Sequence, residues 1–275
     1  MTITTEIPGH VAANGLDIYV EQVGQGPDVL LIGGLGDTVE SWQFQLDGLA
    51  DRYRLTAFDN RGAGRTAMPE APATVEAMAD DAAAVLLALD IPSAHVGGFS
   101  GGSIIAQELA LRHPGLVRSL VLQSTWPTPD PCLRAWMQYV HWLVEVAPSE
   151  RAFLEGFLLD IYTARAHNDG TVAAIIDEAL AFPHKQRTED VQSHLRAFLR
   201  HDTTDRLPEI TAPTLVLSGG RDTTSRPELC RAVADLIPGA RFQLMPDECH
   251  QPFQEVPDDW NARVHAFWRD VDANA

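Results

Sequence analysis

Short apolar runs alternate with amphipathic stretches along most of the chain. The continuous run Val29-Leu30-Leu31-Ile32 indicates a strand that is buried on both faces. Further strands are expected at 17–23, 54–58, 95–98, 119–122, 214–217 and 241–244, and helices at 39–50, 74–89, 103–112, 228–236 and 258–271. Strands that alternate with helices predict an α/β fold, with a mostly parallel sheet and helices on both of its faces.

The strand pattern stops between Trp126 and about Arg206. Helical stretches are expected there at 132–146, 150–166, 171–181 and 189–201. We therefore expect an α/β core formed by residues 1–125 and 207–275, and a helical cap formed by residues 126–206. Aromatic side chains gather in this cap, and their helical spacing favours packing of the cap onto the core. Trp126 follows a core strand directly, so we expect it to face the substrate pocket instead.

A serine lies at the centre of Gly98-Phe99-Ser100-Gly101-Gly102, which matches the pattern G-x-S-x-G between a predicted strand and a predicted helix. A nucleophile on such a turn has a strained backbone, and glycines on both sides leave room for the chain to close. An ordinary glycine-rich turn that merely holds a serine is the alternative. The strand–helix context favours Ser100 as a nucleophile.

A serine hydroxyl needs a base to take its proton. His250 follows the last predicted strand by a short loop and precedes the final helix, so it is expected at the same sheet edge as the serine. A carboxylate between the two in chain order must then orient the imidazole. Asp222, after the strand at 214–217, is the preferred candidate. Asp130 and Asp247 remain alternatives.

An acyl-transfer transition state also needs donors for the developing oxyanion. The amide of Gly101, next after the serine, can supply one donor. The amide of Leu35, in the loop Gly33-Gly34-Leu35-Gly36, can supply the second. Gly34 and Trp126 are the residues expected to contact the substrate. The alternative for the glycine loop is an ordinary turn.

Composition limits the partners that the protein can have. The 38 acidic residues exceed the 20 basic ones and give a formal charge of −18, which argues against nucleic acid and anionic membranes. Residues 1–6 lack the basic and apolar regions of a signal peptide, and no apolar run of about 18 residues occurs. We therefore expect a cytoplasmic protein whose partner is a small molecule and not nucleic acid or a membrane. The sequence does not decide the oligomeric state, and a homodimer is one of the outcomes.

The cysteines give no sign of a disulfide framework or a metal site. Cys132, Cys230 and Cys249 lie far apart and have no CxxC spacing. Neither a metal nor an organic cofactor is expected.

Over nearly its full length the chain resembles the α/β-hydrolase superfamily. The resemblance rests on the Gly33-Gly34 loop, residues 59–66 (Asp-Asn-Arg-Gly-Ala-Gly-Arg-Thr), the Ser100 turn, Asp222 and His250. Within the superfamily the chain looks most like capped esterases and enol-lactone hydrolases. The resemblance implies an eight-stranded sheet and hydrolysis of a small or medium-sized carboxylic ester or lactone through an acyl-enzyme. Other outcomes for the same fold are a carbon–carbon bond hydrolase, a cofactor-free perhydrolase or haloperoxidase, and a non-catalytic small-molecule receptor.

Two positions depart from the pattern of this superfamily. Gly33 stands where a histidine often supports the oxyanion loop, so the rigidity of that loop is open to question. Cys249 stands where many relatives have glycine before the histidine, and we expect its thiol to pack rather than react.

Overall fold

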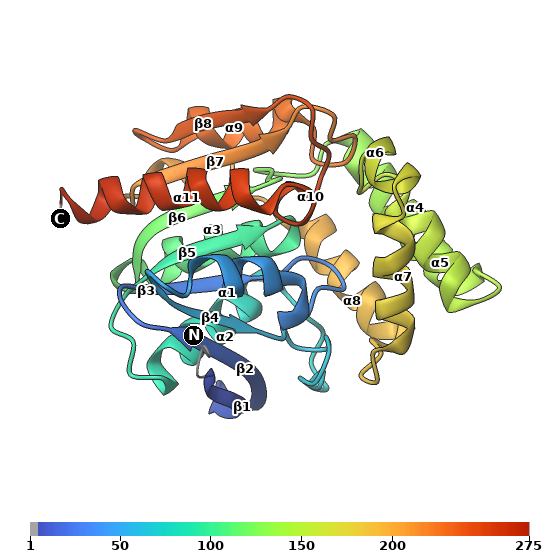
Figure 1. Cartoon of the computed structure of the whole chain (residues 1–275), viewed down its shortest axis with the longest axis horizontal. Coiled ribbons are helices and arrows are strands. Elements are labelled where there is room, and N and C mark those ends of the chain that lie inside the picture. The colour runs from blue at the N-terminus through green and yellow to red at the C-terminus, as the bar shows by residue number, and fades with distance from the viewer. Residues whose placement is uncertain (1–4, 275) are drawn as a thin grey trace.

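The computed structural model describes residues 5–274, which form an eight-stranded sheet between two layers of helices (Figure 1). The strand order is β1-β2-β4-β3-β5-β6-β7-β8. The pairs β1–β2 and β2–β4 are antiparallel, and all the other neighbours are parallel. The strands are β1 (Thr5–Ala13), β2 (Leu16–Gly24), β3 (Asp28–Ile32), β4 (Arg54–Phe58), β5 (Ala94–Phe99), β6 (Val117–Gln123), β7 (Thr214–Gly219) and β8 (Arg241–Met245). The predicted α/β class and mostly parallel sheet are confirmed.

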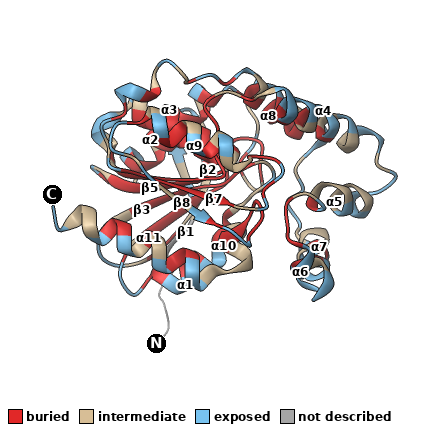
Figure 2. Cartoon of the chain, turned by 90° about the horizontal axis from the view of Figure 1, so that it is seen from above, coloured by how far each residue is buried: buried red, intermediate tan, exposed pale blue. Residues whose placement is uncertain are grey.

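Helices cover both faces of the sheet. On one side lie α1 (Gln43–Leu49), α10 (Pro252–Glu255) and α11 (Pro257–Asp272). On the other side lie α2 (Val75–Ala88), α3 (Gly101–Arg112) and α9 (Pro227–Leu236) (Figure 2). Side chains of β3 alternate between the two layers: Leu30 and Ile32 join the apolar cluster under α2 and α3, and Leu31 joins the cluster under α1 and α11. This alternation explains why β3 is apolar at successive positions.

Residues 126–206 contain five helices, which lie beside the carboxyl ends of the parallel strands (Figure 1). They are α4 (Pro131–Val146), α5 (Glu150–Leu158), α6 (Ala164–Asn168), α7 (Thr171–Ala181) and α8 (Thr188–Arg200). Helix α8 packs against the core, since Leu195 and Phe198 belong to the same cluster as the residues of α2 and α3. Helices α5 to α7 form a small apolar cluster of their own around Ile161 and Ile176. The division into a core and a cap at 126–206 stays a prediction, and "cap" denotes these residues below.

Three details differ from the expected elements. The helix expected at 150–166 is two helices, α5 and α6, separated by Leu159–Thr163. The segment Val39–Trp42 is a 3₁₀ turn that precedes α1. Strand β1 lies outside the expected elements; it is an edge strand that pairs with β2 alone within the sheet, and its Ala13 packs in the apolar cluster under α2. No helix in the described part of the chain is long and apolar enough to cross a bilayer.

Candidate active site

Ser100 lies on a sharp turn between β5 and α3. Its backbone has φ of 51° and ψ of −119°, a conformation that residues other than glycine rarely adopt. A Cβ atom on Gly98 would lie 2.4 Å from the Gly102 carbonyl oxygen, and one on Gly102 would lie 2.0 Å from the Ile32 carbonyl oxygen. Both glycines are therefore required for the turn to close.

His250 links Ser100 to Asp222. Its Nε2 atom lies 3.0 Å from Ser100 Oγ, and its Nδ1 atom lies 2.7 Å from Asp222 Oδ2. The imidazole and the carboxylate are both almost fully buried, at 2% and 3% exposure. With the proton on Nδ1, the ring donates to Asp222 and leaves Nε2 free to accept from the serine hydroxyl. The structure thus brings together the three side chains that the sequence singled out.

The carboxylate of Asp222 is held by a polar turn that the sequence analysis missed. Its Oδ1 atom accepts from the Thr224 amide at 2.9 Å, the Thr224 hydroxyl at 2.9 Å and the Ser225 amide at 3.0 Å. Burial favours a higher pKa, but the adjacent His250 ring and the Thr224 hydrogen bonds outweigh it and hold the pKa of Asp222 below its usual range. Asp222 is therefore ionised at neutral pH. The polar run 222–225, directly after a buried strand, is the signal that could have indicated this turn.

The two alternative carboxylates lie elsewhere. Asp130 accepts from the Leu133 amide at 2.9 Å as the N-cap of α4, and it pairs with Arg226. Asp247 is largely exposed and pairs with Arg221 at 2.8 Å. Among the contacts of the described residues, neither carboxylate reaches His250.

The glycine loop after β3 lies against the serine turn. A Cβ atom on Gly34 would be 3.1 Å from Ser100 Cβ, so a side chain there would crowd the serine turn. The Gly34 amide is already used, since it donates to Asp37 Oδ2 at 2.7 Å. The next amide, of Leu35, is thus the candidate donor from this loop. The candidate from the turn is Gly101, whose amide begins α3 and has no acceptor within that helix.

Asp37 explains how the loop is held without the usual histidine. A Cβ atom on Gly33 would lie 2.7 Å from Asp37 Cβ, so the aspartate occupies that space. Its Oδ1 atom accepts from the Ser41 hydroxyl at 2.8 Å, and the Asn60 amide donates to the Gly33 carbonyl at 3.0 Å. Burial raises the pKa of Asp37, against the effect of its hydrogen bonds with the Ser41 hydroxyl and the Gly34 amide and of the nearby His250. The Asp37 carboxyl group thus supports the glycine loop, and this loop lies next to Ser100.

A cavity of about 1040 Å³ opens above Ser100 and His250, between the core and the cap. We call it the main cavity. Trp126 lines it, as expected, and is 2% exposed; its indole nitrogen has no hydrogen-bond partner in the described structure. Gly34, which was expected to contact the substrate, is not among the lining residues. Its neighbour Leu35 does line the cavity. The wall contributed by the cap is mainly apolar and includes Trp136, Met137, Phe153, Leu154, Phe157, Leu158 and Phe198.

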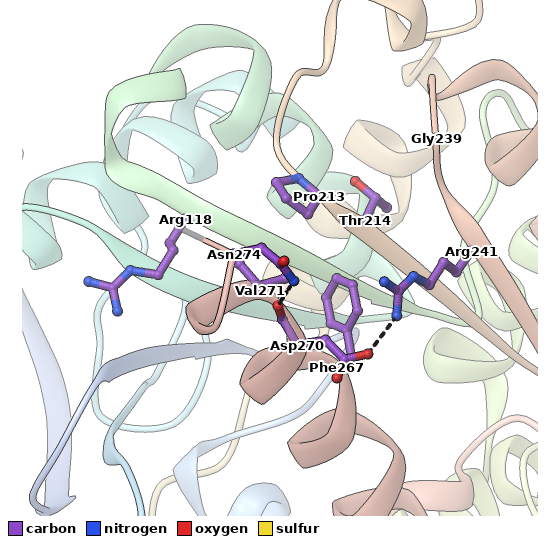
Figure 3. A pocket seen from close by; sticks show the side chains of 9 residues that line it. All are labelled: Arg118, Pro213, Thr214, Gly239, Arg241, Phe267, Asp270, Val271 and Asn274. Atoms are coloured by element: carbon purple, nitrogen blue, oxygen red, sulfur yellow. Dashed lines mark hydrogen bonds and ion pairs between the residues drawn. The ribbon is translucent and has the colours of Figure 1, made fainter.

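A smaller cavity, of about 320 Å³, lies at the opposite end of the sheet, where β6, β7 and β8 begin (Figure 3). Its charged groups are largely paired: Arg241 bonds Asp270 at 3.1 Å, and Arg118 lies 3.5 Å from Asp272. The candidate catalytic residues follow β5, β7 and β8, at the other end of the sheet, where Ser100 and His250 line the main cavity.

Cys249 is packed beside His250. Its Sγ atom lies 3.5 Å from the carbonyl oxygens of Asp160 and Arg221. Burial raises the pKa of this thiol to about 12, so it is protonated at neutral pH. Both observations favour packing over reactivity.

Comparison with known proteins agrees with the fold. The family model described as alpha/beta hydrolase fold matches residues 27–256. The chain therefore belongs to the α/β-hydrolase family and is an enzyme of that class.

Similar proteins carry several different activity names. A protein of Azorhizobium caulinodans named as a carbamate hydrolase, RutD, is 30% identical over 93% of this chain and 96% of its own length. A Mycobacterium tuberculosis protein named as a non-heme bromoperoxidase, BpoC, is 32% identical over 94% of this chain and all of its own. The crystal structure of an enol-lactonase from Burkholderia xenovorans superposes with a TM-score of 0.84 and 25% identity, over 94% of this chain and 99% of that one.

Proposed function

We propose that this protein is a serine hydrolase that cleaves a small or medium-sized carboxylic ester or lactone through an acyl-enzyme. The observation that carries the proposal is the chain of two hydrogen bonds, Ser100 to His250 and His250 to Asp222, at the floor of the main cavity. All three groups are fixed before substrate binds, as a nucleophile, its base and the residue that orients the base must be.

In the proposed mechanism, His250 Nε2 takes the proton of Ser100 as Oγ attacks the carbonyl carbon. The amides of Leu35 and Gly101 donate to the oxyanion of the tetrahedral intermediate, and the N-terminus of α3 favours its negative charge. His250 then protonates the leaving alkoxide, which departs as the alcohol or as the opened end of a lactone. A water molecule, activated by the same imidazole, hydrolyses the acyl-serine.

The size and charge of the main cavity support a neutral substrate. Its volume of about 1040 Å³ lies just above the ~300–1,000 Å³ that is usual for small-molecule sites. The lining includes five acidic residues, namely Asp37, Glu40, Asp47, Glu150 and Glu178. Among the described lining residues Lys185 is the one lysine or arginine, and it pairs with Glu150 at 2.8 Å. Glu40 also pairs with Arg65, which lies outside the lining. The acidic groups of the lining still outnumber the basic ones, so a substrate that carries its own carboxylate meets net negative charge there.

The names of similar proteins fit this reaction type. Lactones and carbamates both present a carbonyl carbon to a nucleophile, as esters do. The relative named as a bromoperoxidase favours one second candidate, perhydrolysis, in which hydrogen peroxide replaces water in the attack on the acyl-enzyme.

A panel of p-nitrophenyl esters and lactones, tested with pure protein and with and without hydrogen peroxide, separates these activities. We expect turnover of neutral esters or lactones, loss of this turnover in Ser100→Ala, and covalent labelling of Ser100 by a fluorophosphonate. Hydrolysis without labelling, or labelling that survives the substitution, contradicts the proposal. Labelling without turnover of any ester or lactone favours a receptor that retains the site.

A further inference from the structure

We propose that the cap segment 160–165 positions His250, so that the placement of the cap and the alignment of the base depend on each other. The inference rests on the proposed role of His250 as a base. Its residues, Thr163 and Arg165 above all, touch neither the reacting atoms nor Ser100. Arg165 contacts the loop between β8 and α10, residues 246–251, and Thr163 contacts α10, which follows that loop.

The backbone of His250 is held from two sides. Its amide donates to the carbonyl of Ile161, in the break between α5 and α6, at 3.1 Å. Its carbonyl accepts from the hydroxyl of Ser124, which follows β6 in the core, at 2.8 Å. The residue that bears the base thus bridges cap and core, and a shift of the cap pulls on one side of it.

The cap segment also forms hydrogen bonds with residues on both sides of His250 in the chain. Before it, Arg165 donates to the carboxylate of Glu248 at 2.7 Å. After it, the carboxylate of Glu255 accepts from the Thr163 amide at 3.1 Å and from the Thr163 hydroxyl. The Tyr162 hydroxyl donates to Gln254, also in α10. These contacts join the cap segment 160–165 to the chain before His250, at Glu248, and after it, at Gln254 and Glu255.

Burial makes the contacts with Glu255 costly to lose. The Glu255 side chain is 1% exposed, and burial raises its pKa, whereas the Thr163 hydrogen bonds and the Arg165 charge lower it. Buried carboxylates depend on such donors, because water cannot replace them. The segment therefore cannot move away from α10 without leaving a buried acid poorly solvated.

The same segment touches the substrate space. Ile161 and Tyr162 both line the main cavity. A ligand that fills the cavity bears on these two residues, and through them on the amide and the flanks of His250. Because the reacting atoms need near-ideal placement, a small displacement of the imidazole lowers kcat more than it weakens binding.

Thr163→Val tests the proposal, since it removes the hydroxyl while it keeps the branched shape. We expect kcat for a neutral p-nitrophenyl ester to fall about tenfold, within the ~10²-fold that a 1 Å misplacement can cost, with KM little changed. Thr163→Ser should restore kcat. The downfield proton resonance of the hydrogen bond between His250 and Asp222 should broaden or shift in the Val variant and return in the Ser variant.

A matched pair of arginines provides the control. Arg165 is 49% exposed and reaches Glu248, whereas Arg151 is 48% exposed and pairs with Asp177 at 2.5 Å within the cap. We expect Arg165→Ala to lower kcat and alter the resonance, and Arg151→Ala to leave both unchanged.

A lower melting temperature of the Thr163→Val and Arg165→Ala variants, with kcat and the resonance as in the wild type, would overturn the proposal and leave the contacts as structural ties. Equal effects of Arg165→Ala and Arg151→Ala would overturn it too. The resonance is measured without turnover, so it reports on this coupling even if the wild-type protein hydrolyses no ester.

Discussion

The core wall of the main cavity is polar and hydrogen-bonded, whereas the cap wall that faces it is mostly apolar. On the core side, Ser100 and His250 line the cavity and lie 3.0 Å apart, and Asp222 holds His250 from outside the lining at 2.7 Å. On the cap side, aromatic and aliphatic residues of α4, α5 and α8 line the space. Hydrogen bonds are directional and fix atoms to a fraction of an ångström, while apolar contact is not directional. If the proposed function is correct, we therefore expect the core wall to carry the reaction chemistry and the cap wall to set which acyl groups fit.

The strongest test of this assignment is Ser100→Ala. If the core wall carries the chemistry, kcat for esters should fall by about 10⁶-fold, because the members of such a triad act as a unit. Fluorophosphonate labelling should disappear, which intact-mass spectrometry measures. A thermal melt close to that of the wild type is the control for folding. Residual activity near the wild-type level would place the chemistry elsewhere in the cavity.

The second test concerns which carboxylate orients the base. Asp222→Asn leaves the site intact in shape but favours the wrong imidazole tautomer, so kcat should fall by about 10⁴-fold. Asp247→Asn is the matched control, since Asp247 is close in sequence to His250 but 74% exposed and paired with Arg221. Steady-state kinetics on the same ester should show that variant near the wild type. The reverse result would exchange the roles of the two residues.

The third test addresses the cap side of the comparison, at Trp126, where the core strand β6 leads into the cap. Truncation to Ala enlarges the main cavity, so kcat/KM should shift by about tenfold toward bulkier acyl groups, while turnover of short esters changes little. Kinetics with acetate to decanoate esters, paired with thermal melts, measure this shift. An unchanged preference with a lower melting temperature would assign Trp126 to packing alone.

Local sequence was sufficient for the serine turn but not for everything that His250 touches. The glycines around Ser100 are adjacent in sequence and demanded by the backbone, so the motif can be recognised without a fold. The choice of Asp222 over Asp247 needed the order of strands in the sheet. Thr224 could have been inferred only as part of a polar run, since its partner is set by that order.

The break in the cap could not be predicted from its own residues. Positions 150–166 have helical spacing, and the chain leaves the helix at Leu159–Thr163, where the Ile161 carbonyl accepts from the distant His250 amide. Thr163 then caps α6, its hydroxyl accepting from the Ala166 amide at 3.3 Å. Asp37 is a similar case, because its support of the glycine loop depends on space that Gly33 leaves empty. Contacts between residues far apart in the chain decided both.

The smallest expected effect comes from Asp37, the acidic group of the main cavity that supports the glycine loop beside Ser100. The test compares a p-nitrophenyl ester that bears a carboxylate with its neutral methyl ester. If the charge of Asp37 helps to exclude anionic substrates, Asp37→Asn should raise the ratio of kcat/KM for the first ester to that for the second by a few-fold. This corresponds to about 1 kcal/mol, the interaction expected between charges separated by water-accessible space. Glu209→Gln, an exposed acid outside the cavity lining, removes the same net charge and should leave the ratio unchanged. Added salt should narrow the difference between wild type and Asp37→Asn, because mobile ions screen the field. Equal ratios in all three proteins would show that the acidic lining does not select the substrate and that the apolar cap wall alone does.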